Sequence, residues 1–345
     1  MRALALLATG GPDQLELRDM PMPAIRDPGD VLIRIRAVAL NRLDVWVAGG
    51  LPNLHLSFPH IVGSDGAGVV EAVGDGVRDF RPGDPVMVNP GVSCGRCAAC
   101  RADEESLCAE FRLLGEHLPG LAAEYAVVPA QNLAPVPEAM PWPQAAAFSL
   151  VTLTAWRMLT SRAHLRNGET VLIWGIGGGV ALAGLQIVRL LGGRAIVTSG
   201  TDAKLAAARE LGADETINHA TSDVVAEVRR LTGGAGADVV LDSVGERTWA
   251  ASLRALRRGG RLVVCGATTG PAASFDIRRL FWHQWSILGS TMGSRREYGE
   301  IVRLAHQGKL WPVVDRVVPL PDGATAFARL QRGEQTGKLV IEVAP

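Results

Sequence analysis

The chain has 345 residues, too many for one ordinary hydrophobic core, so two domains are expected. Its 35 basic residues balance its 35 acidic ones, and no basic run stands out, which argues against nucleic acid or an anionic membrane as the main partner. The first apolar stretch is too short for a signal peptide, and no apolar run approaches the length of a membrane span. We expect a cytoplasmic protein that acts on a small-molecule substrate.

Residues 1–130 are predicted to form strands and turns. The run Val31–Val38 alternates apolar and polar residues as a half-buried strand does, and further strands follow between Gly-Asp and Pro-Gly turns. After about Pro143 apolar runs alternate with helical stretches, which is typical of a doubly wound parallel sheet. The expected strands of that sheet are Thr170–Gly175, Arg194–Thr198, Ala237–Asp242, Gly260–Gly266 and Ser286–Gly289.

Four of the five cysteines lie in one short segment with the spacing C-x2-C-x2-C-x7-C: Cys94, Cys97, Cys100 and Cys108. Four thiolates at such spacing can close a tetrahedron around one zinc ion, which would be structural because no coordination position stays open. Disulfides are disfavoured in a reducing compartment. An iron–sulfur cluster is the remaining alternative, although no proline follows a cysteine here.

A glycine-rich turn separates an apolar strand from a helix that runs to Leu191. The order strand, glycine turn, helix, strand is the unit that binds the pyrophosphate of a dinucleotide at a helix N-terminus. The residues expected to hold that pyrophosphate are Gly175, Gly177, Gly178, Gly179 and Val180.

The chain resembles the medium-chain dehydrogenase/reductase superfamily, which includes zinc-dependent alcohol dehydrogenases and quinone oxidoreductases. The resemblance lies in G-S-D-G-A-G-V-V-E-A-V-G at Gly63–Gly74, in the four-cysteine lobe, in the glycine turn and in the closing G-K-L-V. It implies an α/β fold: a β-rich GroES-like catalytic domain from residues 1–130 and 300–345, with a zinc lobe at 91–112, and a Rossmann domain at 131–299.

The ligands of the superfamily's catalytic zinc are missing. Zinc alcohol dehydrogenases hold that metal with a cysteine three residues before an aspartate, with the histidine of G-H-E-x-x-G and with a second cysteine. In this chain the first position is Asn41, three residues before Asp44, and the second is Ser64. The segment expected to carry the second cysteine, Ala145–Thr154, contains none. The neutral oxygens of serine and asparagine are weak zinc ligands. A site rebuilt from His60, Asp65 and His117 is the alternative.

The end of the second Rossmann strand bears on the choice of cofactor. An NAD site usually has an acid there, but this strand is followed by no acid until Asp202, which is expected to lie in the next helix. Ser199, Thr201 and Lys204 could instead bind a 2′-phosphate, which favours NADPH over NADH. A helix cap at Thr201, a solvated Lys204 and a surface-loop His219 are the plainer interpretations. The expected contacts here are Ser199, Gly200, Thr201, Lys204 and His219, with Gly266 from a later strand.

Without catalytic zinc, nothing strongly polarises an alcohol oxygen, and hydride transfer to a quinone or an enone becomes the natural reaction. The expected catalytic residues are Asn41, which resembles the N-x-x-D stretch of quinone oxidoreductases together with Asp44, and Thr154 near the nicotinamide. Trp46, Phe281 and Trp282 could line an apolar pocket. An alcohol dehydrogenase with an atypical metal and a non-catalytic NADPH-binding protein are the alternatives. A homodimer or homotetramer is expected, because the last strand, Ser286–Gly289, is an apolar edge.

Overall fold

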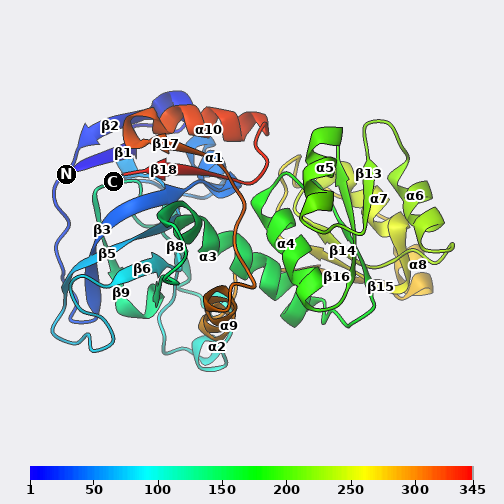
Figure 1. Ribbon diagram of the computed structural model, residues 1–345, viewed down its shortest axis with the longest axis horizontal. Helices are drawn as coiled ribbons and strands as arrows, with labels where there is room; N and C mark the ends of the chain where they lie inside the picture. Colours follow the sequence, from blue (N-terminus) through cyan, green and yellow to red (C-terminus); the bar gives the residue numbers. More distant parts are fainter. Residues whose placement is uncertain (344–345) are drawn as a thin grey trace. The chain divides into compact units, whose positions relative to one another are not determined.

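The structure, a computed structural model, describes residues 1–343 and divides into two compact units (Figure 1). The chain passes between them after Val151 and after Met292, whereas the sequence predicted boundaries after residues 130 and 299. The first half of helix α3 (Trp142–Arg157) belongs to the first unit because the Leu150 N–H donates to Asp65 Oδ1 at 2.8 Å. Ser149 Oγ also lies 2.9 Å from Tyr298 Oη, so the returning chain is held in the same unit.

The first unit is built on a sheet with the order β10-β6-β5-β3-β18-β17, in which β9 also pairs with β3. Strand β3 alternates between half-buried and buried residues along most of its length, as its sequence pattern predicts. A Cβ at Gly68 would come within 2.2 Å of the Arg34 carbonyl oxygen, so the close pairing of β5 with β3 requires glycine there. The strands are β3 (Asp30–Ala39), β5 (Asp65–Val73), β6 (Pro85–Val88), β9 (Tyr125–Pro129), β10 (Leu133–Pro135), β17 (Val314–Pro319) and β18 (Lys338–Glu342).

Smaller elements complete the first unit. A three-stranded sheet has the order β2-β1-β4, and a two-stranded sheet, β7-β8, flanks the cysteine segment. The sequence predicted no long helix before residue 130, and the helices found there are short. The remaining elements are β1 (Arg2–Leu6), β2 (Leu15–Asp19), β4 (His60–Ile61), β7 (Gly91–Val92), β8 (Arg112–Leu113), α1 (Arg42–Gly49), α2 (Ala98–Arg101), α9 (Arg295–His306) and α10 (Gly323–Arg332).

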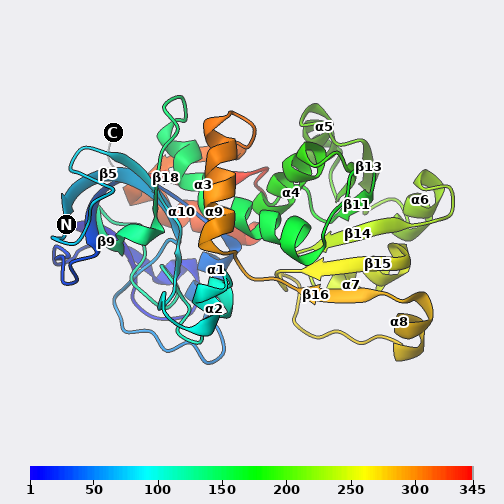
Figure 2. The same cartoon turned by 90° about the horizontal axis from the view of Figure 1, so that it is seen from below.

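The second unit is a six-stranded parallel sheet with the order β13-β12-β11-β14-β15-β16. Figure 2 shows β14, β15 and β16 running side by side. The strand order reverses at β11, so right-handed crossovers put α4 and α5 on one face and α6 and α7 on the other. The elements are β11 (Thr170–Ile173), α4 (Gly179–Leu190), β12 (Arg194–Ser199), α5 (Asp202–Glu210), β13 (Glu215–Asn218), α6 (Val224–Leu231), β14 (Ala237–Asp242), α7 (Glu246–Ala255), β15 (Leu256–Val264), α8 (Ile277–His283) and β16 (Ser286–Gly289).

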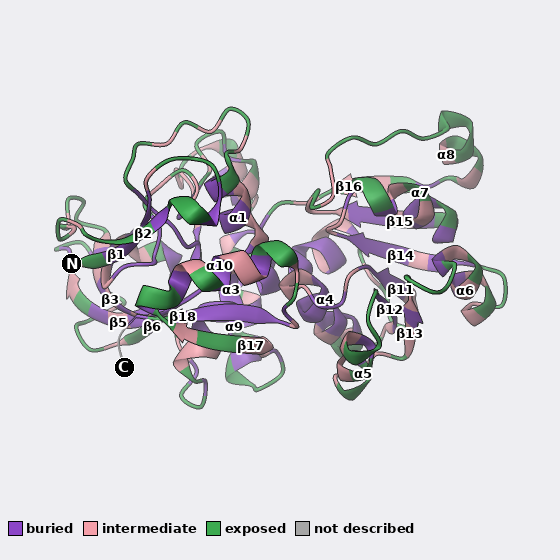
Figure 3. Ribbon diagram, turned by 90° about the horizontal axis from the view of Figure 1, so that it is seen from above, coloured by how far each residue is buried: buried purple, intermediate pink, exposed green. Residues whose placement is uncertain are grey.

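The central strands of this sheet are buried, whereas α8 has no buried residue (Figure 3). Each of the five predicted Rossmann strands is present, and the sequence missed only the short β13 at the edge. The predicted doubly wound α/β fold is therefore confirmed.

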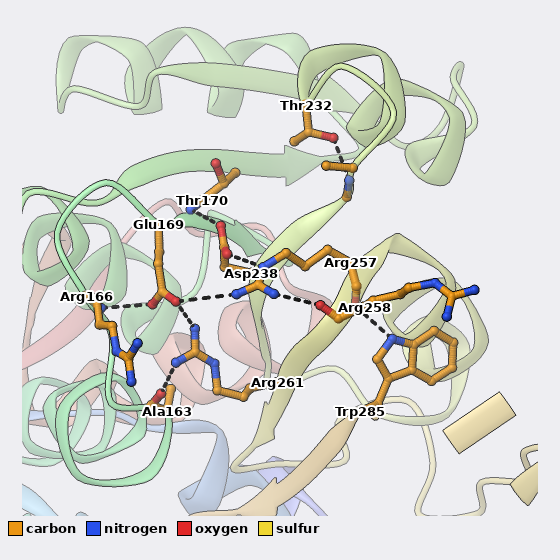
Figure 4. Close-up of polar contacts among 12 residues, drawn as sticks. Ala163, Arg166, Glu169, Thr170, Thr232, Asp238, Arg257, Arg258, Arg261 and Trp285 are labelled. Atoms are coloured by element: carbon orange, nitrogen blue, oxygen red, sulfur yellow. Dashed lines mark hydrogen bonds and ion pairs between the residues drawn. The ribbon is translucent and has the colours of Figure 1, made fainter. Parts of the chain in front are cut away.

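An ion-pair network joins the amino ends of β11, β14 and β15 (Figure 4). Asp238 accepts from the Thr170 N–H at 2.7 Å and from Arg257 Nε. Glu169 pairs with Arg261, whose guanidinium also donates to the Ala163 carbonyl oxygen at 2.7 Å. The network fixes the edge of the sheet opposite the glycine turn, which follows the carboxyl end of β11.

Candidate functional site

The four clustered cysteines form a preorganised metal site in the first unit. Their sulfur atoms all lie within 4.8 Å of one another, with separations of 3.5 Å for Cys97–Cys100, 3.6 Å for Cys94–Cys108 and 3.9 Å for Cys94–Cys100. Four thiolates around a zinc ion at 2.3 Å would be about 3.8 Å apart. The sulfurs therefore fit a tetrahedral zinc ion, and a zinc with four protein ligands is structural.

Backbone amides favour the thiolate state that zinc binding requires. The N–H groups of Arg96 and Cys97 point at the Cys94 sulfur and lower the pKa of that thiol to about 6. The Glu110 N–H similarly approaches Cys108 Sγ at 3.4 Å. Among residues 1–343 this is the one group of three or more histidine, cysteine or acidic side chains close enough to share a metal ion.

The cysteine segment is tied to the start of helix α9. Glu105, in the loop between Cys100 and Cys108, is almost fully buried and accepts from Arg295 Nε at 2.8 Å and from the Arg295 backbone N–H at 3.2 Å. A carboxylate at a helix N-terminus also interacts favourably with the helix dipole. The lobe thus holds the chain where it re-enters the first unit.

A second cluster in this unit, which we call the buried polar centre, consists of Asn41, Asp44, Ser64, Asp65 and Lys338. The ends of three neighbouring strands bring it together: Asn41 and Asp44 follow β3, Ser64 precedes β5, Asp65 begins β5, and Lys338 begins β18. None of the five side chains is more than 5% exposed. An ionisable group this deeply buried is normally paired, and these are.

Lys338 and Asp65 fix the orientation of the Asn41 amide. Lys338 Nζ donates to Asn41 Oδ1 and, at 3.0 Å, to Asp65 Oδ2, while Asn41 Nδ2 donates to Asp65 Oδ2 at 3.0 Å. An ammonium only donates and a carboxylate only accepts, so the amide oxygen must face Lys338 and its nitrogen Asp65. The second Nδ2 hydrogen has a longer contact, 3.4 Å, to the Ala39 carbonyl oxygen.

Asp44 lies on the other side of Asn41. Its carboxylate accepts from the Asn41 backbone N–H at 2.6 Å and from Ser64 Oγ at 3.2 Å. Burial raises the pKa of Asp44 to about 6, and the charge of Lys338 opposes that rise. Asp44 therefore positions Asn41 through the backbone N–H at the start of α1.

These residues do not suit a catalytic metal. The buried polar centre supplies amide and hydroxyl oxygens. Its two carboxylates are already engaged, because Asp65 pairs with Lys338 and Asp44 accepts from Asn41 and Ser64. The alternative ligands are occupied elsewhere: His60 Nε2 lies 3.2 Å from the Gly115 carbonyl oxygen, and His117 Nδ1 accepts from the Leu113 N–H at 3.3 Å. The buried polar centre therefore does not fit a catalytic metal.

The glycine turn in the second unit has the geometry of an anion site. Gly175 has φ +66°, a conformation that favours glycine, and Gly178 is the N-cap of α4 without a side chain to cap it. The first helical hydrogen bond runs from the Leu182 N–H to the Gly178 carbonyl oxygen, so the amides of Gly179 and Val180 precede the intrahelical ladder. Such amides bind the pyrophosphate of a nicotinamide dinucleotide.

The edge beyond β12 carries the other predicted cofactor contacts. Ser199 ends the strand, Gly200 and the N-cap Thr201 follow, and Asp202 begins α5 as expected. The Asp202 carboxylate accepts from Asn218 Nδ2 at 2.7 Å, which fixes its position. Lys204 is half-buried on α5, and His219 is exposed just beyond β13, next to Gly200.

The remaining predicted residues are dispersed. Thr154 is buried in α3, where its Oγ1 donates to Met292 Sδ at 3.8 Å, and Gly266 is half-buried after β15. Both belong to the second unit, whereas Asn41 and Asp44 belong to the first. Phe281 and Trp282 lie on α8, at the amino end of β16, and are 64% and 66% exposed. The idea that they line a pocket is wrong, because the glycine turn is at the opposite edge of the sheet.

Sequence reasoning missed Lys338, whose ammonium donates to both Asn41 and Asp65 in the buried polar centre. A signal was present: only three lysines occur in the chain, and this one begins an otherwise apolar run, Lys338–Ile341. Its partner Asp65 was considered only as a metal ligand.

Comparison with known proteins shows the family to which the chain belongs. Residues 27–138 match the alcohol dehydrogenase GroES-like domain family, and residues 179–307 match the zinc-binding dehydrogenase family. A crystal structure of an NAD-dependent alcohol dehydrogenase superposes with a TM-score of 0.96 at 45% identity, covering all of both chains. Crotonyl-CoA reductase of Streptomyces avermitilis is 31% identical, over 96% of this chain and 82% of its own. Quinone oxidoreductase of Homo sapiens is 29% identical, over 99% of this chain and 97% of its own.

Proposed function

Because the chain belongs to the medium-chain dehydrogenase/reductase superfamily, we propose that it reduces a quinone or an activated alkene with NADPH and without a catalytic metal. It is an oxidoreductase with a nicotinamide cofactor and a structural zinc lobe. The finer proposal rests on one observation above all: of the two residues at the catalytic-zinc positions, Asn41 contacts the Lys338 ammonium and Asp65, and Ser64 donates to Asp44.

The chemistry of a conjugated acceptor suits such a centre. When bound, the reduced nicotinamide supplies a hydride. The hydride adds to the β-carbon of an enone, the electron pair moves to the carbonyl oxygen, and a proton from solvent then reaches the α-carbon. The charge on that oxygen is spread by conjugation, so a hydrogen-bond donor can stabilise it without a Lewis acid. In this proposal the donor is Asn41, through the Nδ2 hydrogen whose contact to Ala39 is long.

An alcohol dehydrogenase is the second candidate, since the solved structure reported above carries that activity in its name. The two proposals differ in metal content and in substrate. One zinc per chain with turnover of quinones or enones supports the first, and two zincs per chain with secondary alcohols preferred supports the second. The test is a panel of quinones, enones and secondary alcohols. Turnover is followed by NADPH and NADH absorbance, and elemental analysis gives the zinc content. Binding of NADPH without turnover on any class would favour a non-catalytic protein.

The enzyme is expected to bind NADPH more tightly than NADH. The Asp202 carboxylate accepts from Asn218 Nδ2, and in this proposal Ser199, Thr201 and Lys204, at the end of β12 and the start of α5, bind the 2′-phosphate. Loss of a hydrogen bond to this phosphate in Lys204→Ala should cost about 1.5–3 kcal/mol, less if the lysine is well solvated. Dissociation constants for both cofactors measure this, with the exposed Lys309→Ala as control. Equal affinities of the wild-type protein for the two cofactors would refute the preference.

A homo-oligomer is expected in solution. Strand β16 pairs only with β15 among the described strands, and its residues Ile287 and Leu288 are half-buried at the edge of the sheet. A second copy would satisfy the unpaired backbone groups of that edge. Light scattering at micromolar concentration should report a dimer or a tetramer, and a monomer would contradict the prediction.

The protein is proposed to act in the cytoplasm. Within residues 1–343, no helix has both the length and the apolar character needed to cross a membrane. The cytoplasm is reducing, and it would keep the four cysteines of the lobe available as thiolates for zinc.

A further inference from the structure

We propose that Lys338 is a positioning residue of the reaction, whose ammonium takes the place of a catalytic cation and fixes and polarises the Asn41 amide. The inference rests on the proposed function, because it assumes that Asn41 faces the developing charge. It assigns a role to a lysine that begins the last described strand and lies almost three hundred residues from Asn41 along the chain.

The ammonium of Lys338 is shielded from solvent. Lys338 is 3% exposed, and its partner Asp65 is fully buried. A lysine so deeply buried retains its charge only if partners compensate for its lost hydration. Both of its partners belong to the buried polar centre, so the positive charge is held within that centre.

In this proposal the ammonium polarises the Asn41 amide. Donation to Oδ1 withdraws electron density from the amide and makes the Nδ2 hydrogens stronger donors, as hydrogen bonds in a chain reinforce one another in a low-dielectric interior. Asp65 takes one of these hydrogens at 3.0 Å. The other, with its 3.4 Å contact to Ala39, is the one that a substrate oxygen can accept. Lys338 thereby supplies positive charge to the substrate through Asn41 rather than by contact.

Lys338 balances the charge of buried carboxylates. Asp65 from β5 pairs with its ammonium, Asp44 from α1 interacts with the same charge, and Tyr298 of α9 also interacts with Asp65. Without Lys338 both carboxylates would lose this counter-charge. Carboxyl groups that ionise less readily in the folded chain than in the unfolded chain make stability fall as pH rises. Loss of Lys338 should therefore destabilise the protein more at pH 8 than at pH 5.

The first experiment compares Lys338→Met with the exposed-lysine control Lys309→Met on the substrate that the wild type turns over best. We expect Lys338→Met to lower kcat about tenfold or more, with a smaller change in KM; direct oxyanion donors typically contribute a hundredfold to a thousandfold. Its midpoint of urea unfolding should shift further below that of the wild type as pH rises from 5 to 8. Lys309→Met should match the wild type in both measurements.

The second experiment separates positioning from stability with the double variant Lys338→Met/Asp65→Asn. This variant removes the charged pair together. The new amide oxygen can still accept from Asn41 Nδ2, but the Leu150 N–H then loses its acceptor, Asp65 Oδ1. The unfolding midpoint should recover in part and lose much of its added pH dependence, while kcat stays low. Recovery of kcat along with stability would overturn the proposal, because Lys338 would then serve only to neutralise Asp65.

The outcomes also separate this inference from the proposed function. If the wild type prefers secondary alcohols but the double variant is stable and slow, the proposed substrate class fails and the role of Lys338 stands. If the wild type prefers quinones or enones and the double variant is as fast as the wild type, the proposed substrate class stands and the role of Lys338 fails. A wild type that turns over no member of the panel overturns both.

Discussion

Asn41→Ala is expected to lower kcat on quinones or enones by about a hundredfold or more, equivalent to about 2.7–4 kcal/mol of activation free energy. The reason is that a donor aimed at the enolate-like oxygen acts chiefly in the transition state, so KM should change much less. Steady-state kinetics on the wild type's best acceptor measures the effect. The structure adds that the same change removes a partner from both Lys338 and Asp65.

Ser64→Ala is the matched control for that prediction. Ser64 is fully buried like its neighbours, but its hydroxyl donates to Asp44 and not to Asn41. We expect its kcat to stay within a few-fold of the wild type. Thermal unfolding of both variants shows whether each is folded under assay conditions. If a chelator that strips a labile metal abolishes wild-type activity, or if Asn41→Ala is as active as Ser64→Ala, the metal-free mechanism is wrong.

Cys97→Ser is expected to abolish stoichiometric zinc binding and to loosen residues 91–112. Structural zinc in small zinc-dependent domains contributes about 10–16 kcal/mol of apparent binding free energy at pH 7, and that energy is available only to the folded lobe. Elemental analysis should give one zinc per chain for the wild type and far less for the variant. Amide hydrogen exchange should speed up in the lobe and at the start of α9, which Glu105 holds through Arg295.

Cys265→Ser provides the control for zinc binding. Cys265 follows β15 in the second unit, outside the group of four sulfurs, so its loss should leave the zinc content at one per chain. NADPH binding should survive Cys97→Ser, because the glycine turn lies in the second unit. Two zincs per chain in the wild type, or none, would contradict the assignment.

The zinc lobe and the Rossmann sheet were predictable because their signals are local. Four cysteines within fifteen residues and glycines between a strand and a helix can be read without knowing what lies beside them. Helix α9 had a local signal too: Ser294 and Glu297 form a capping box, with the Ser294 N–H donating to Glu297 at 2.7 Å. The sequence analysis used neither residue and predicted no helix there.

The buried polar centre was only half predictable. Asn41 and Ser64 were conspicuous because they stand where metal ligands would be, and that comparison led to the metal-free interpretation. Lys338 could not be placed by the same means, since it meets Asn41 through strand pairing across the sheet. Sequence periodicity identifies a strand but not its neighbours, so the partner of a buried charge stays hidden until the order of strands is known.

The position of β18 between β3 and β17 also imposes an order on biosynthesis. A ribosome that adds 5–20 residues each second needs on the order of ten seconds to make the second unit, which lies between Val151 and Gly293. During that delay the end of β3, Ala37–Ala39, has an open edge, and Asp44 and Asp65 have no ammonium. The nascent N-terminal segment therefore cannot complete its core until Lys338 emerges from the exit tunnel. The Rossmann unit is one continuous segment of the chain, so it can fold while the N-terminal segment is still incomplete.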